Sequence, residues 1–162
     1  MHLAELNVAR LNYPFDDPRV ADFADNLDLV NGIAECSKGF VWRLKDNGSG
    51  NAIDIRAFDD PSVITNLSVW QSPKHHLERF VWNTVHRRFY QRRAEWFELI
   101  GAQHFVMWWV DEGHLPSIEE AKARLDHLQA HGDSDIAFGW SHLPHVKLAA
   151  GALRLTGKGK NG

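Results

Sequence analysis

Apolar and polar residues alternate near the start of the chain, where Leu6 and Val8 share one face and Glu5 and Asn7 share the other. This period of two predicts a β-strand over residues 3–11. After Asp16-Asp17-Pro18, which is typical of a helix start, apolar residues recur at helical spacing. They predict a helix over about residues 18–36, with a weak point at Asn31-Gly32.

The rest of the chain continues in the same mixed pattern. Apolar spacing predicts a long helix over about 73–97 and another over 118–131. The second helix has a capping box at Ser117 and Glu120 and a glycine, Gly132, where a C-terminal cap is expected. Short apolar runs bounded by turn residues predict strands over 40–45, 53–58, 63–70, 105–110 and 136–141.

This order of elements, β-α-β-β-β-α-β-α-β, predicts an α+β fold with a largely antiparallel sheet and helices on one face. In the strand Phe105–Val110 both alternating faces are apolar. The face away from the helices must therefore be covered as well. The simplest cover is the sheet of a second copy, so we expect a homodimer.

Composition limits the class of protein. The chain has 162 residues, 44% of them hydrophobic, and a net charge of −3, which fits one domain over residues 1–145. Residues 146–162 are expected to form a mobile tail because Ala, Gly and Lys dominate there. The sequence shows neither a signal-like apolar start nor a run of about 20 apolar residues. We therefore expect a cytoplasmic protein without a membrane partner.

The isoelectric point and the cysteine count each exclude one possibility. A pI near 6.3 gives no basic excess for binding nucleic acid. Cys36 is the only cysteine, so an internal disulfide is excluded.

Seven tryptophans beside nine phenylalanines are unusual. Because each indole is a large rigid apolar group, this excess suggests a lined cavity or a large interface.

Several segments resemble a known group of proteins. Ile64–Ser72, followed by a helix with His86, resembles the dimeric α+β barrel superfamily, which includes antibiotic-biosynthesis and quinol monooxygenases and haem-binding branches. Phe40–Leu44, Asp54–Phe58 and His86–Phe89 resemble more closely the bacterial DUF3291 family within it. The resemblance covers about residues 2–145.

The resemblance implies a ferredoxin-like protomer that forms a barrel with its partner and encloses a ligand cavity between sheet and helices. Cofactor-independent monooxygenases of the superfamily oxidise electron-rich phenols or quinols with molecular oxygen. Such a reaction needs polar groups that bind a phenolate and walls that exclude water.

One face of the strand 63–70 carries Asn66, Ser68 and Trp70. Buried polar groups of this kind cost about 1–3 kcal/mol each when they lack a partner. A ligand oxyanion would satisfy them, and the spacing of Asn66 and Trp70 resembles the substrate-contacting pair of the antibiotic-type monooxygenases. The alternative is that Asn66 bonds to a neighbouring side chain and Trp70 only packs.

On a helical wheel His86 and Tyr90 lie at the margin of the apolar face, beside Trp82. From there His86 could act as a general base on a phenol or as the axial ligand of a haem. Trp42, Trp82 and Tyr90 would fence the aromatic ring. The alternative is a boundary histidine bonded to a backbone carbonyl.

Arg43 and Arg56 each lie in the middle of a predicted strand and could bind a carboxylate or phenolate. The alternative is an internal ion pair with Glu5. By contrast, the arginines of the predicted helix 73–97 are expected on its solvated surface; they are Arg87, Arg88, Arg92 and Arg93. His127 and His131 share a helix face but lack a third ligand, so no metal site is expected.

The leading hypothesis is a cofactor-independent monooxygenase acting on a small aromatic molecule, with His86, Asn66 and Trp70 as the catalytic residues. The substrate-binding residues would be Trp42, Arg43, Arg56, Ser68, Trp82 and Tyr90. One alternative is a haem-binding protein with His86 as axial ligand. Another is a dimer without catalytic activity, in which the tryptophans serve the core and the interface.

Overall fold

The computed structural model describes residues 1–46, 52–53, 55–75, 84–98, 100 and 103–143. Its centre is one antiparallel sheet of five strands. The strands are β1 (His2–Leu11), β2 (Phe40–Arg43), β3 (Val63–Trp70), β4 (Phe97–Glu98) and β5 (Phe105–Val110). The helices are α1 (Ala21–Glu35), α2 (Pro73–His75), α3 (Thr84–Arg92) and α4 (Ile118–His131), with 3₁₀ turns η2 (Arg93–Glu95) and η3 (Trp140–His142).

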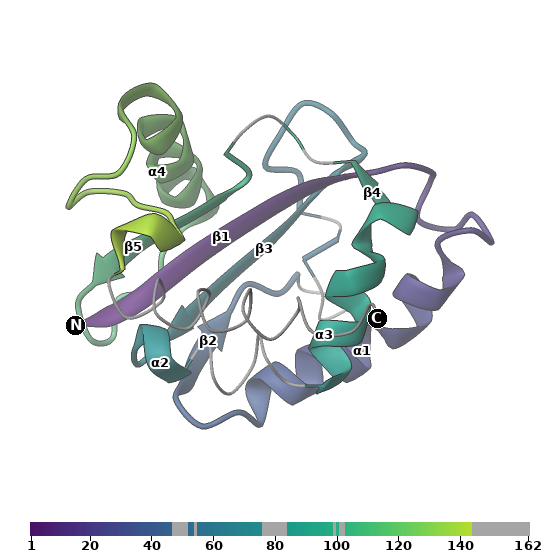
Figure 1. The fold of residues 1–162 in the computed structure, drawn as a ribbon, viewed down its shortest axis with the longest axis horizontal. Helices are drawn as coiled ribbons and strands as arrows, with labels where there is room; N and C mark the ends of the chain where they lie inside the picture. The colour runs from purple at the N-terminus through teal and green to yellow at the C-terminus, as the bar shows by residue number, and fades with distance from the viewer. Residues whose placement is uncertain (47–51, 54, 76–83, 99, 101–102, 144–162) are drawn as a thin grey trace, which may run out of the picture.

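The long strand β1 organises the sheet (Figure 1). It pairs with β3 from Leu3 opposite Trp70 to Arg10 opposite Val63. Along its other edge it pairs first with β5 and then, at Arg10 and Leu11, with β4. The outer strand β2 pairs with β3. Every residue of β1 therefore has strand neighbours, and its alternating side chains define the two faces of the sheet.

One face, which we call the α4 face, is apolar and tightly covered. It carries Leu6 and Val8 of β1 with Leu67 and Val69 of β3, all almost fully buried. The buried side of α4 packs against them through Ala121, Leu125 and Leu128. Close packing of this kind stabilises the fold by about 1.5–3 kcal/mol for each large apolar side chain removed from water.

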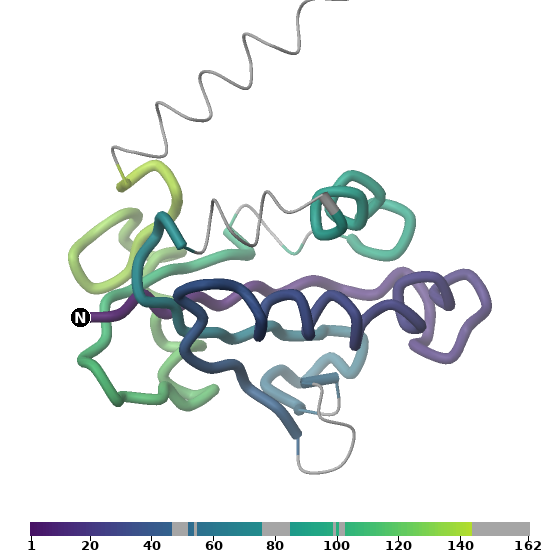
Figure 2. The backbone as a smooth tube through the Cα atoms, turned by 90° about the horizontal axis from the view of Figure 1, so that it is seen from below, coloured from purple at the N-terminus to yellow at the C-terminus, as the bar shows by residue number. Residues whose placement is uncertain are grey.

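The opposite face, which we call the α1 face, carries the intervening residues of the same strands. Residues Val30, Ile33 and Ala34 of α1 pack there against Trp70. Figure 2 shows β1 and β3 side by side in one thin layer, with α3 on one side of it. Contacts between α1 and α3 place both helices near the same part of the sheet.

The α+β class with an antiparallel, ferredoxin-like sheet is confirmed. The placement of the helices is corrected in one respect, because α4 lies on the face opposite to α1. The apolar face that led us to expect a partner sheet is thus buried within one chain. The homodimer stays a prediction, but it no longer follows from an uncovered apolar face.

Most element boundaries agree with the pattern. The strands 63–70 and 105–110 and the helix 118–131 have the predicted bounds. Ser117 accepts a hydrogen bond from the Glu120 amide through its side chain, and Gly132 caps the helix at a positive φ of 73°. The first helix starts later than predicted, at Ala21, and runs unbroken through Asn31 and Gly32.

Three predictions were wrong in the part of the chain that the structure describes. Residues 53 and 55–58 do not form a strand. The helix predicted to reach residue 97 ends at Arg92, because the chain turns through η2 and joins the sheet as β4. Residues 136–141 contribute one bridge, between Met107 and Phe138, before turning into η3.

Some predictions fall on residues that the structure does not describe. They concern most of the turn at 46–51, the residue Trp82 and the tail at 146–162. Within the described ranges, no helix has the length and apolar character needed to cross a bilayer.

Candidate functional site

A cavity of about 200 Å³ lies between the α1 face of the sheet and the helices α1 and α3. Its floor comes from strands, through Asn7 and Ala9 of β1 and Ile64 and Asn66 of β3. These residues share a face because they alternate with the buried residues of the α4 face. The helices contribute the walls, through Phe23, Leu27, Val30 and Asn31 of α1 and His86, Phe89 and Tyr90 of α3.

The polar part of the floor is a pair of asparagines. Asn7 and Asn66 stand directly opposite each other in the β1–β3 ladder, and both line the cavity. Side chains paired in this way lie about 4.5–5.5 Å apart at Cβ. Two amides at this distance can together donate to one ligand oxygen, because each has two N–H donors.

One end of the cavity is an aromatic wall formed where α1, α3 and the sheet meet. The ring of Trp96 is only 1% exposed, and it lies between Phe23 at 5.8 Å and Phe89 at 5.7 Å, measured between ring centroids. Phe23 also meets Phe97 edge to face at 4.9 Å. Such packed rings form a rigid apolar surface suited to a flat ligand.

Basic side chains line the cavity. Arg43, Arg93, His86 and His104 line it, and its described lining contains neither Asp nor Glu. The rings of His86 and Tyr90 stack at 6.5 Å, one helical turn apart. The Arg43 charge is compensated, since its Nε lies 2.7 Å from Glu35 Oε1. Lys45 and Arg43 together hold the pKa of Glu35 below its ordinary value.

Next to the asparagine pair, the α1 face holds a buried hydrogen-bond chain. Trp70 Nε1 donates to Ser68 Oγ, and Ser68 Oγ donates to Glu5 Oε1, each at 2.8 Å. Glu5 is 4% exposed, and this burial raises its pKa to about 7 against the opposing effect of the Ser68 hydrogen bond. Ser68 and Trp70 thus have partners within the chain, and neither lines the cavity.

Trp70 is also held by packing. Its ring meets Phe40 edge to face at 5.4 Å, and it is fully buried beside Ala34. This arrangement corresponds to the alternative reading of Trp70 as a packing residue. The part of the strand face that opens into the cavity is Ile64 and Asn66.

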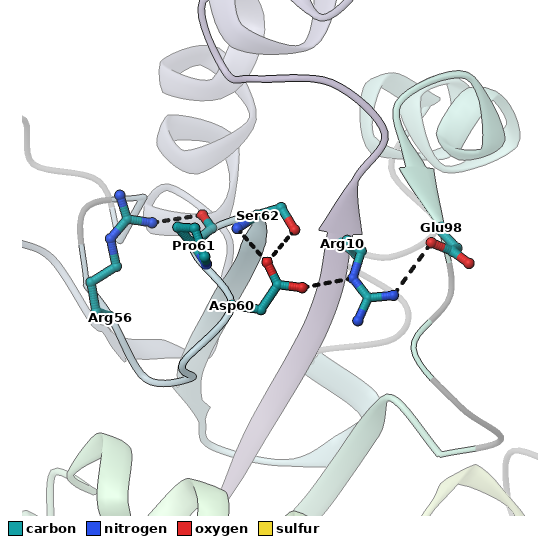
Figure 3. A network of polar contacts seen from close by, with 6 residues as sticks. All are labelled: Arg10, Arg56, Asp60, Pro61, Ser62 and Glu98. Atoms are coloured by element: carbon teal, nitrogen blue, oxygen red, sulfur yellow. Dashed lines mark hydrogen bonds and ion pairs between the residues drawn. The ribbon is translucent and has the colours of Figure 1, made fainter.

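The other predicted site residues lie elsewhere. Trp42 packs against the cluster on the α4 face. Arg56 donates to the Pro61 carbonyl oxygen at 2.6 Å, beside the network in which Arg10 contacts Asp60 at 2.9 Å and Glu98 at 3.4 Å (Figure 3). Neither lines the cavity. Trp82 lies outside the described residues.

The structure therefore brings together Asn66, His86, Tyr90 and Arg43. Among the lining residues that sequence reasoning missed are Asn7, Arg93 and His104. The alternation of residues 3–11 places Asn7 on the same face as Glu5 and could have identified it. Arg93 was assigned to the solvated helix surface, because the turn of η2 was not predicted.

The histidine pair on α4 has no role in this site. The rings of His127 and His131 lie 4.6 Å apart, and His127 contacts Ser134 Oγ at 3.2 Å. In the described ranges, no three metal-ligating side chains come together as a group.

The fold and the cavity define a class: an α+β protein with a cavity between its antiparallel sheet and two helices. The chain matches a family described as a domain of unknown function (DUF3291) over residues 2–151. It belongs to this family. Among curated proteins, none matches the chain.

Proposed function

We propose that the protein binds a small phenol or quinol in the cavity on its α1 face and oxidises it with molecular oxygen, without a cofactor. The observation that carries this proposal is that Asn66 and His86, singled out from the sequence, line one cavity beside an aromatic wall. The resemblance to the monooxygenases of the dimeric α+β barrel superfamily supports the type of reaction.

In this proposal His86 accepts the phenolic proton, because a histidine placed within reach of an acidic hydroxyl is a suitable general base. The amides of Asn7 and Asn66 donate to the resulting phenolate oxygen. The aromatic wall and Tyr90 hold the ring and limit the access of water.

The redox balance closes without another reactant. In an anthrone-type phenol, the carbanion formed by deprotonation is the reductant of oxygen. One CH₂ group and one O₂ give one carbonyl group and one water, so one oxygen atom enters the product and the other leaves as water.

The dimensions of the site limit the ligand. The cavity of about 200 Å³ is smaller than the roughly 300–1,000 Å³ of pockets for drug-sized molecules. It suits a ligand of two or three fused rings. This size favours such a ligand over a haem, and the haem alternative, with His86 as axial ligand, is an outcome of the test below.

Oxygen uptake with dithranol tests this proposal. We expect uptake by the wild type and a loss of at least about 100-fold in His86→Ala, as for removal of a general base. Asn66→Ala should also lose activity. His127→Ala is the control because His127 is a histidine outside the cavity, and it should keep the wild-type rate.

Two results would contradict the proposed function. One is normal turnover by both His86→Ala and Asn66→Ala. The other is binding of dithranol without oxygen uptake, which would favour a binding protein over an enzyme. A sharp Soret band after mixing with haem, lost in His86→Ala, would instead support the haem alternative.

A further inference from the structure

Two basic side chains, Arg93 and His104, lie near each other in the cavity lining. Arg93 lies in η2, and His104 precedes β5, where its carbonyl oxygen accepts from the Val8 amide at 2.9 Å. Burial and then the nearby Arg93 guanidinium lower the pKa of His104. The two residues come from distant parts of the chain and both line the cavity.

Arg93 differs from Arg43, the other arginine of the lining. Arg43 has a carboxylate partner in Glu35. The Arg93 guanidinium instead contacts Tyr90, by a hydrogen bond to the Tyr90 carbonyl oxygen at 2.8 Å and by stacking 4.1 Å from the ring centroid. Among the described residues, no carboxylate forms an ion pair with Arg93.

One polar atom of His104 lacks a hydrogen-bond partner among the described residues. Its Nδ1 is buried and makes no hydrogen bond to any described part of the chain. A buried polar atom without a partner costs about 1–3 kcal/mol. A ligand oxygen bound beside Arg93 would supply this missing partner and would also balance the guanidinium charge.

We propose that Arg93 and His104 form an anion subsite that binds the carboxylate of an aromatic ligand. This inference rests on the proposed function and specifies its substrate as a hydroxyaromatic acid. Arg93 follows α3 in η2, seven residues after His86. Tyr90 lies between them in the chain, with its ring 6.5 Å from the His86 ring and 4.1 Å from the Arg93 guanidinium. The hydroxyl and the carboxylate of the ligand therefore lie at opposite ends of its ring system.

Calorimetric titration with three related compounds tests the subsite. The compounds are 6-hydroxy-2-naphthoate, its methyl ester and 2-naphthol, measured at pH 7.5. The wild type should bind the acid about tenfold or more tightly than the ester, as expected for a charge-assisted contact. In Arg93→Gln this preference should fall below about threefold, while the Kd of 2-naphthol should stay unchanged.

Two variants complete the design. Arg88→Gln removes the same charge from an exposed position of α3 outside the cavity lining, and it should keep the wild-type preference. His104→Leu should reduce the preference for the acid by about threefold or more, because the ligand then loses a hydrogen bond. An unchanged 2-naphthol Kd in each variant shows that the cavity is intact.

The possible failures are distinguishable. If the wild type binds acid and ester equally, or if Arg93→Gln keeps the preference, the subsite is wrong while aromatic binding stands. If His104→Leu keeps the full preference, His104 is not part of the subsite as proposed. If none of the three compounds binds, the proposed function fails, and the subsite falls with it.

Discussion

The two faces of the sheet use alternate residues of the same strands for different purposes. On the α4 face Leu6 and Leu67 are opposite each other and buried under Leu125. One residue further along each strand, Asn7 and Asn66 are opposite each other and line a cavity. A packed core and an open cavity can therefore share one β-ladder, because side chains alternate between the two faces of the sheet.

The covering helices account for the difference. The helix α4 brings small and medium apolar side chains directly onto its face. On the other face, Trp96 lies between Phe23 of α1 and Phe89 of α3. These three rings line the cavity together with the asparagine pair, so the cover on this face leaves an open volume.

The largest expected effect concerns packing on the α4 face. Leu125→Ala should lower the free energy of unfolding by about 2–5 kcal/mol, because it removes a buried side chain and leaves a cavity. Asn66→Ala, at the exposed floor of the other face, should change it by less than about 0.5 kcal/mol. Urea unfolding measures both. Equal losses in the two variants would contradict the division between the faces.

The next effect concerns Glu5, the buried acid of the α1 face. Its pKa is raised to about 7 in the folded protein, so the folded state holds more protons than the unfolded state between pH 4.5 and 7. The free energy of unfolding contributed by this group is therefore fully present below about pH 4.5 and is lost as the pH rises through 7.

Glu5→Gln keeps an acceptor for Ser68 but cannot ionise. We expect it to be more stable than the wild type at pH 8, by on the order of 1–3 kcal/mol, and to lose this pH dependence. Unfolding by urea at pH 5 and pH 8 is the measurement. Glu98→Gln is an exposed control, and a Glu5→Gln variant that is less stable at pH 8 would overturn the explanation.

A smaller effect is expected at the start of α4. Ser117→Ala removes the side chain that accepts from the Glu120 amide, so it should cost about 1 kcal/mol. Ser117→Asp should restore the stability because aspartate also caps helices well. Neither change should alter the Kd of 2-naphthol, since α4 covers the opposite face. A weakened affinity in Ser117→Ala would show that the faces are coupled.

The sequence predicts the elements whose signals are local. The alternation of residues 63–70 and the cap residues Ser117 and Gly132 specify their structures directly. The end of α3 was missed because Phe97 fits a helical apolar stripe equally well, and only its pairing with Leu11 makes it a strand residue. Tertiary pairing of this kind leaves no local signal.

The candidate site was predictable to a similar extent. Alternation placed Asn66 and Ser68 on one face, but it could not show that Glu5 satisfies Ser68 while Asn66 opens into the cavity. The predicted partner of Arg43 was Glu5, whereas the structure pairs it with Glu35. Such choices depend on which helix lies above each residue.

The central claim is that the ligand site lies on the α1 face. Its most direct test is a two-dimensional ¹H–¹⁵N NMR titration of the wild type with 2-naphthol. The side-chain amide signals of Asn7 and Asn66 and the indole signal of Trp96 should shift, while the indole signal of Trp108 on the α4 face should not. Shifts at Trp108 without shifts at Asn7 and Asn66 would contradict the account.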